Sequence, residues 1–160
     1  IDLVMGTFSK GLGSFGAYIA CSQLLKEYLI NACSGLIYAT ALPPAVLGAM
    51  DAALDLLPTL EQEREQLQYN AAWIRQCWRD SGVDTGLSST QIIPWIVGSE
   101  QQAMAMSAAL EEHGILAVAI RPPTVPQGQS RIRFSLTTLH NQQMLQKLVE
   151  TVVQLHGLMG

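Results

Sequence analysis

The sequence has little cysteine, little charge and no long apolar run. Its three cysteines, Cys21, Cys33 and Cys77, form no C-x-x-C pair, so they indicate neither a zinc site nor a disulfide framework. Charged residues make up 14% of the chain and the net charge is −4, which argues against nucleic acid or an anionic membrane as a partner. The longest apolar stretch, 41–50, is too short to cross a bilayer. These absences favour a reducing, cytoplasmic setting without a metal or membrane role.

The chain contains enough hydrophobic residues to form a core. The chain has 160 residues, of which 49% are hydrophobic, enough for one domain or for a small domain plus a piece of a larger one. It begins with a strand-like run, 1–5, and has no initiator methionine. We therefore expect a fragment that starts inside a domain.

Hydrophobic periodicity and helix-end signals predict both strands and helices along the chain. The predicted strands cover 2–5, 16–21, 92–97, 115–120 and 131–136. The predicted helices cover 23–32, 43 to about 57, 58 to about 80, 100–113 and the segment after Asn141. The two groups together predict a mixed α/β chain.

Lys10 lies in a loop with four glycines, directly after a predicted buried strand. A nucleotide phosphate loop needs a hydroxyl residue after the lysine, whereas Thr7 and Ser9 come before it. A second interpretation is a solvated loop lysine. A third is a lysine that forms a Schiff base with pyridoxal 5′-phosphate (PLP), with the two hydroxyls serving the phosphate. The loop alone leaves the second and third interpretations open.

Two arginines alternate with apolar residues near the end of the chain. Arg131 and Arg133 fall on one face of the strand predicted at 131–136, and three apolar side chains fall on the other. They are either solvated, or one of them binds a carboxylate through its guanidinium fork. Arg121, in a proline-rich loop, is open to a substrate contact or to an ion pair that fixes the loop.

The three histidines are interpreted as structural. His113 ends a predicted helix, where the helix dipole favours it. His140 lies beside the N-cap of the last helix, and His156 is expected at the surface.

Three motifs in order resemble the α-oxoamine synthases, a family of fold-type-I PLP enzymes with the aspartate aminotransferase fold. Thr7-x-Ser9-Lys10-x-x-Gly13-x-x-Gly16 is similar to the family's PLP-lysine motif. The stretch 36–44 resembles the one that reaches the neighbouring subunit's cofactor phosphate. The stretch 119–126, followed by 131–133, resembles the substrate-binding segment.

This resemblance implies a domain division and roles for individual residues. Residues 1–57 would end the large PLP-binding domain, 58–81 would form a connecting helix, and 82–160 would form the small C-terminal α/β domain. Lys10 would be the catalytic, cofactor-holding residue. The other implied site residues are Thr7, Ser9 and Thr40 for the cofactor, the last across a homodimer interface, and Arg133 and Arg121 for the substrate.

The resemblance also implies a reaction. The segment 120–126 most resembles the family members that condense L-alanine with a pimeloyl thioester, with decarboxylation, in biotin synthesis. The alternatives are a sister synthase that uses glycine and a non-enzymatic α/β interaction domain. The family's other cofactor-binding groups precede the lysine and cannot be assigned here. We therefore expect this chain alone to be inactive and to hold PLP weakly.

Overall fold

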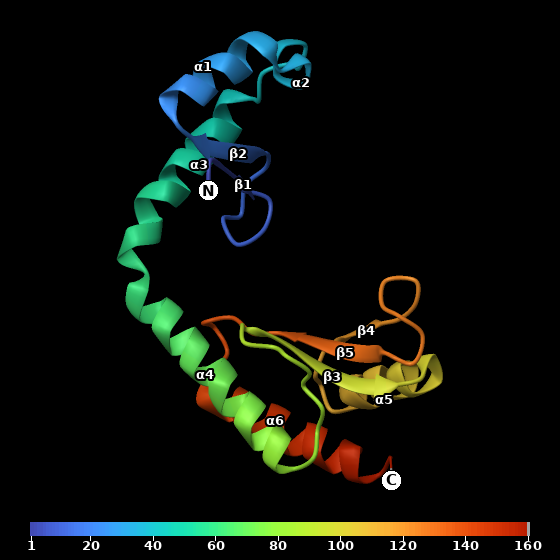
Figure 1. Ribbon diagram of the computed structural model, residues 1–160. Helices are drawn as coiled ribbons and strands as arrows, with labels where there is room; N and C mark the ends of the chain where they lie inside the picture. The colour runs from blue at the N-terminus through green and yellow to red at the C-terminus, as the bar shows by residue number, and fades with distance from the viewer. Residues whose placement is uncertain (160) are drawn as a thin grey trace. The chain divides into compact units, whose positions relative to one another are not determined.

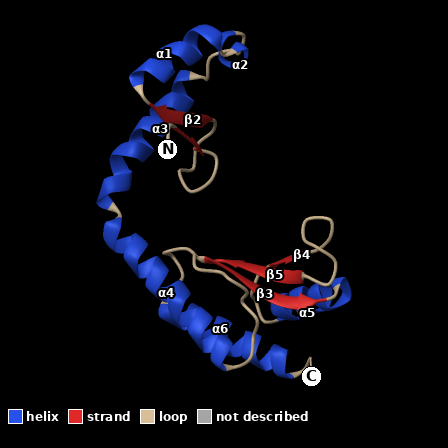
Figure 2. Cartoon of the chain, in the orientation of Figure 1, coloured by secondary structure: helices blue, strands red, loops and turns tan. Residues whose placement is uncertain are grey.

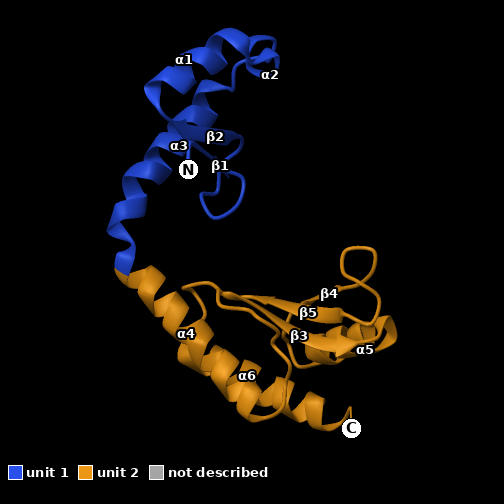
Figure 3. Ribbon diagram, viewed as in Figure 1, with its two compact units in different colours: residues 1–61 blue, residues 62–160 orange. Residues whose placement is uncertain are grey.

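A computed structural model describes residues 1–159, which form both strands and helices (Figures 1 and 2). The chain forms two compact units, Ile1–Glu61 and Gln62–Gly160 (Figure 3). We call them unit 1 and unit 2. The assignment of these parts to the large and small domains of a larger enzyme stays a prediction.

Unit 1 begins with an antiparallel pair of strands, β1 (Leu3–Thr7) and β2 (Ala17–Cys21). The register runs from Leu3 opposite Cys21 to Thr7 opposite Ala17. This pairing closes the glycine-rich segment into a loop, so both predicted strands are confirmed. The expected burial of the first strand is wrong, because Leu3, Val4 and Met5 are 40%, 46% and 70% exposed.

The rest of unit 1 is helical. Its elements are α1 (Gln23–Ala32), α2 (Ser34–Ile37), α3 (Pro44–Leu56) and the 3₁₀ turn η1 (Leu57–Thr59). Helix α1 starts where the Ser22 hydroxyl accepts a hydrogen bond from the Leu25 amide, at 3.3 Å. Pro44 opens α3, where its missing N–H costs no hydrogen bond. The short helix α2 is not among the predicted elements.

Unit 2 contains a three-stranded antiparallel sheet in the order β3-β5-β4. Its strands are β3 (Ile92–Gly98), β4 (Val118–Ile120) and β5 (Ser130–Ser135). The strand predicted at 115–120 starts only at Val118, and that prediction is wrong for its first half. The reason is that the Ile115 amide donates to the Leu110 carbonyl, at 2.9 Å, in the turn that closes the preceding helix.

Three helices complete unit 2: α4 (Glu61–Asp80), α5 (Glu100–Glu112) and α6 (Gln142–Gly157). Ser99 and Gln102 form a reciprocal capping box at the start of α5. Asn141 caps α6 by accepting from the Met144 amide at 3.0 Å. None of the helices within residues 1–159 combines the length and the apolar character that crossing a membrane requires.

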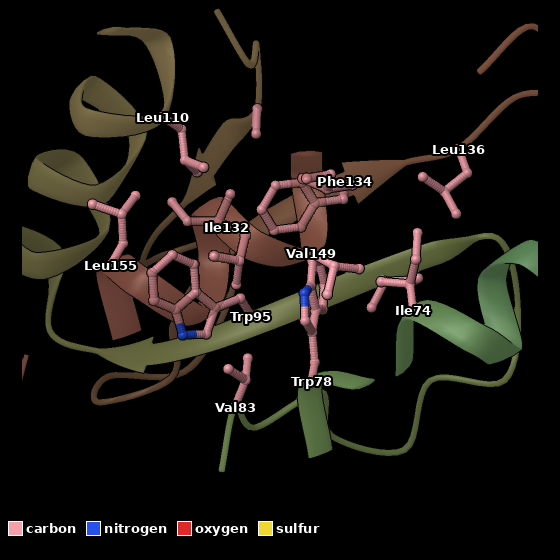
Figure 4. Packing of buried hydrophobic residues seen from close by; sticks show 14 of the residues in the cluster. Ile74, Trp78, Val83, Trp95, Leu110, Ile132, Phe134, Leu136, Val149 and Leu155 are labelled. Atoms are coloured by element: carbon pink, nitrogen blue, oxygen red, sulfur yellow. The ribbon is translucent and has the colours of Figure 1, made fainter. Parts of the chain in front are cut away.

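The core of unit 2 lies between one face of the sheet and these helices (Figure 4). Ile132 and Phe134 of β5 are buried, whereas Arg133 between them is exposed, which confirms the predicted alternation. The ring of Trp78 from α4 packs against that of Phe134 with centroids 5.0 Å apart. The sheet therefore has one covered apolar face and one face that carries the arginines.

His156 is not the surface residue expected from the sequence. Its Nδ1 atom is buried without a hydrogen-bond partner among the described residues, and its ring meets Trp95 edge to face at 6.2 Å. In α6, His156 lies four residues after Val152, which is fully buried, so the two side chains fall on one face of the helix. The histidine therefore shares the covered side of the helix.

Candidate functional site

The loop that carries Lys10 is folded back on itself between β1 and β2. The Phe8 amide donates to the Gly16 carbonyl at 3.0 Å, which extends the ladder by one step. The Ser14 amide donates to the Phe8 carbonyl at 2.9 Å, and the Gly13 amide donates to the Lys10 carbonyl at the same distance. Lys10 therefore lies at the tip of an ordered turn.

Close packing fixes the base of this loop. Phe8 is 5% exposed and its ring meets Tyr18 edge to face at 5.3 Å. Gly16 has a φ of +94°, and a Cβ atom there would lie 2.8 Å from the terminal methyl group of Met50 in α3. A Cβ atom on Gly6 would lie 2.4 Å from the Tyr18 ring. Gly6 and Gly16 are thus both needed for the close contacts that hold the loop.

The hydroxyls of Thr7 and Ser9 form a pair beside Lys10. Their oxygens lie 2.8 Å apart, and the Thr7 hydroxyl donates to the Gly16 carbonyl at 3.0 Å. The single Thr7 proton is used in that bond, so the Ser9 hydroxyl donates to Thr7 while both bonds exist. An incoming anion would take the Ser9 proton by turning that hydroxyl away from Thr7.

The amine of Lys10 is available. The side chain is exposed and has no hydrogen bond or ion pair within residues 1–159. The backbone amides of Lys10, Gly11 and Leu12 also donate to no acceptor in that part of the chain. Which backbone amides of the loop are free could not be predicted from the sequence, although the glycine-rich composition favours such a turn. An exposed primary amine, two hydroxyls and free N–H groups can together hold an anion and react with an aldehyde.

Thr40 lies in unit 1 on the irregular segment between α2 and α3. It is exposed, and its hydroxyl has no partner among the described residues. No hydrogen bond joins it to the Lys10 loop within residues 1–159. Its predicted role across a subunit interface stays a prediction.

The two arginines of β5 share one face but differ in their contacts. Arg131 is partly buried and its Nε donates to the Gln129 carbonyl at 2.9 Å. Arg133 is exposed and has no hydrogen bond or ion pair in residues 1–159. It lies on the central strand, between Pro94 of β3 and Val118 of β4. Arg133 is therefore the arginine of this strand that is free to take a carboxylate.

Arg121 directly follows β4 and opens the proline-rich loop. The Thr124 amide donates to its carbonyl at 3.0 Å, so the loop begins with a turn. Its guanidinium is exposed and has no partner among the described residues, which does not support an ion pair within this chain as its role.

Sequence reasoning did not identify Arg75, which lies on the buried side of α4. It is 7% exposed, and its guanidinium donates to the Thr90 carbonyl ahead of β3. Burial, and secondarily the positive charge of Arg79, lowers the pKa of Arg75 from its usual value. The contact ties α4 to the start of the sheet, which is a structural role.

A family model described as aminotransferase class I and II matches residues 1–152. The chain belongs to this family. The match includes the Lys10 loop and β5 with its arginines. It confirms the predicted α/β fold of the aspartate aminotransferase type.

Curated members of the family are similar to this chain over nearly all of its length. A Paramagnetospirillum magneticum protein named "Putative 8-amino-7-oxononanoate synthase" is 59% identical over 152 residues, 95% of this chain and 39% of its own length. The 8-amino-7-oxononanoate synthase of Gluconacetobacter diazotrophicus is 50% identical over 161 residues, 99% of this chain and 40% of its own. The chain thus spans about two fifths of the curated relatives that it matches, and the resemblance drawn from its motifs is confirmed.

Solved structures of the aminotransferase fold match both units. The serine palmitoyltransferase of S. paucimobilis, solved with a bound PLP-myriocin aldimine, has a TM-score of 0.89 and 26% identity, over 100% of this chain and 41% of that one. An 8-amino-7-oxononanoate synthase of Francisella tularensis has a TM-score of 0.84 over 98% of this chain and 46% of that one, and at 24% identity it shows the fold alone.

Proposed function

We propose that this chain is part of a PLP-dependent acyltransferase that condenses L-alanine with a pimeloyl thioester to give 8-amino-7-oxononanoate. The observation that carries the proposal is the free Lys10 amine beside the Thr7–Ser9 hydroxyl pair. Relatives that are 50% and 59% identical carry the name of this synthase, which supports the choice of reaction within the family.

The residues of the loop fit the cofactor. PLP presents an aldehyde and a phosphate, and when bound it supplies an electron sink for the substrate α-carbon. Lys10 offers the exposed amine that an aldehyde requires. Ser9 offers a hydroxyl and the loop offers free amides, which are donors that a phosphate requires, and Thr7 would add its hydroxyl on releasing the Gly16 carbonyl. Thr40 would add a hydroxyl from a second subunit, so we propose a homodimer.

Arg133 would bind and orient the amino acid. The backbone of Arg133 is held in the central strand, and its exposed guanidinium is free. It can therefore bind the alanine carboxylate through two parallel hydrogen bonds. Arg121 would contact the second substrate or the same carboxylate from the neighbouring loop.

Lys10 Nζ would then accept the proton from the alanine α-carbon. The α-carbon forms a bond to the thioester carbonyl carbon, the thiol departs, carbon dioxide is lost and a proton returns to the α-carbon. The amine therefore serves first as the cofactor anchor and then as a base, for which its exposed position at the loop tip leaves it room to move.

A sister synthase that uses another amino acid is the second candidate. Its support is the likeness to serine palmitoyltransferase, at 27% identity and a TM-score of 0.89 for the Sphingomonas wittichii enzyme. The identity of 50% to 59% with relatives named for 8-amino-7-oxononanoate favours the first candidate.

A chimera tests the proposal. This chain replaces the matching segment of the G. diazotrophicus synthase, to which it is 50% identical over 161 residues. We expect the chimera to form 8-amino-7-oxononanoate from L-alanine and pimeloyl-coenzyme A, and the chain alone to form none. A folded chimera that binds PLP but prefers glycine or serine over alanine would support the sister synthase instead. Mass spectrometry of the products decides between them.

In the chimera, Arg133→Ala should raise the KM for L-alanine by about 10- to 100-fold, because a charge-assisted hydrogen bond contributes roughly 1.5–3 kcal/mol. Arg131→Ala is the matched control on the same strand face, and since its side chain bonds Gln129 we expect a smaller change in that KM. Steady-state kinetics at several alanine concentrations measure both. A larger rise in KM for Arg131→Ala than for Arg133→Ala would indicate that Arg131 binds the alanine carboxylate instead.

A further inference from the structure

Unit 2 contains a pocket that none of the proposed cofactor- or substrate-binding residues lines. Its volume is about 350 Å³, within the range of roughly 300–1,000 Å³ typical of small-molecule sites. It lies where three segments meet: the turn after α5 (114–116), the end of β5 with the residue that follows it (134–136), and the first turns of α6.

The pocket wall is apolar, with two nitrogen-bearing side chains. Leu136, Met144 and Leu148 are among the apolar lining residues, and the polar side chains are those of Ser135, His140 and Lys147. No aspartate or glutamate lines the pocket. This combination fits a ligand with an apolar chain and an anionic end.

Lys147 has its charge available. Its ammonium group lies 3.7 Å from the position that a Cβ atom on Gly114 would take, so it stands over the α5 turn at the pocket. It has no hydrogen bond or ion pair within residues 1–159. The nearest acidic residues along these elements are Glu111 and Glu112, before the turn, and Glu150, which accepts from Gln146 at 2.7 Å. None of these carboxylates neutralises Lys147 by a direct contact.

His140 contributes a donor whose tautomer the fold determines. Its Nδ1 accepts a hydrogen bond from the Thr137 amide at 3.0 Å. In the neutral ring the proton is therefore on Nε2, which leaves an N–H donor on the other side of the ring. The structural role expected for His140 and a donor role at the pocket are compatible, because they use different nitrogens.

We propose that this pocket binds a small amphipathic anion, with its apolar chain against the α6 leucines and its acidic group near Lys147 and His140. The inference is independent of the proposed reaction, because it depends on no residue of the candidate catalytic site. Octanoate is a suitable probe, since it combines an eight-carbon chain with one carboxylate.

The test is a titration of the ¹⁵N-labelled 160-residue chain, followed by NMR. Octanoate should shift amides of 114–116, 134–136 and 140–148 and few others. Octylamine, with the opposite charge, should bind at least about fivefold more weakly, and acetate, without the chain, should produce no shifts there. Equal binding of octanoate and octylamine, or octanoate shifts confined to other segments, would overturn the proposal.

Two variants sharpen the result. Lys147→Gln should weaken octanoate binding about fivefold and leave octanol binding unchanged, whereas Lys26→Gln, an exposed lysine of unit 1, should change neither. Met144→Trp places a larger side chain at a lining residue that is 52% exposed, and it should abolish octanoate binding while the fold persists by circular dichroism. Octanoate shifts that survive in Met144→Trp would contradict the assigned site.

Discussion

Unit 1 buries two apolar side chains, Phe8 and Met50, whereas the described part of unit 2 buries eighteen in one cluster. Unit 1 is nevertheless rich in apolar residues. Helix α1 buries none of its side chains, and Leu24 and Tyr28 on it are 79% and 65% exposed. Both units are therefore rich in apolar residues, but unit 2 buries far more of its apolar side chains than unit 1 does.

The contrast separates two ways of holding a functional group. Arg133 is placed by the central strand of a sheet whose other face is a full core, so its position follows from burial of Ile132 and Phe134. Lys10 is placed by backbone hydrogen bonds, two glycine contacts and a single buried ring. Unit 1 leaves most of its large apolar side chains exposed, and exposed apolar surface of this kind is typical of interaction sites.

The largest effect should come from the core of unit 2. Ile132→Ala should lower the free energy of unfolding by about 2–5 kcal/mol, because it removes fully buried methyl groups. Urea denaturation followed by tryptophan fluorescence measures this cost for unit 2 alone, since Trp73, Trp78 and Trp95 all lie in it. Ile92→Ala on the paired strand, 45% exposed, is the control and should cost under about 1 kcal/mol. Equal losses of unfolding free energy in Ile132→Ala and Ile92→Ala would contradict the position of the core in the structure.

A smaller effect is expected at the base of the Lys10 loop. Gly16→Ala should destabilise the loop by about 1–3 kcal/mol, since its φ of +94° is strained for alanine and its Cβ would approach Met50. Hydrogen exchange of the Phe8 amide, which donates to Gly16, should speed up accordingly. Gly11→Ala is the matched control, because a Cβ there meets nothing within 4 Å. Unchanged exchange in Gly16→Ala would show that the loop does not depend on this contact.

The smallest effect compares the same substitution in the two units. Ser22→Ala and Ser99→Ala each remove an N-cap hydroxyl, at a cost of about 1 kcal/mol to the helix that follows. Only Ser99→Ala should move the tryptophan-reported transition, because Ser22 caps a helix of unit 1. A comparable shift from Ser22→Ala would indicate that the units unfold as one.

Much of the fold can be predicted from local chemistry. The capping box at Ser99 and Gln102, the proline that opens α3 and the alternation along β5 are short-range signals, and each is present in the structure. The start of β4 was predicted three residues too early, because whether Ile115 joins a strand or a helix end depends on which carbonyl its amide meets. Strand pairing joins residues that are far apart in the sequence, so the hydrophobic periodicity of a single segment does not predict it.

Some features of the candidate site can likewise be predicted from the sequence, whereas others depend on tertiary packing. The chemistry of Lys10, Thr7 and Ser9 can be predicted because the three residues are neighbours in sequence. The difference between Arg131 and Arg133 in contacts, the burial of Arg75 and the burial of the His156 Nδ1 atom depend on tertiary packing and so became visible only in the structure. The roles of all the candidate site residues stay predictions: Lys10, Thr7, Ser9, Thr40, Arg133 and Arg121.

The most direct test of the central claim, that Lys10 holds the cofactor, is reduction of the PLP-loaded chimera with borohydride, followed by mapping of the pyridoxyl-labelled peptide. The segment from this chain contributes only three lysines, Lys10, Lys26 and Lys147, so the label can be assigned without ambiguity among them. We predict that the label is found on Lys10 and is lost in Lys10→Ala. A label on Lys26, on Lys147 or on a lysine from the other part of the chimera would contradict the account.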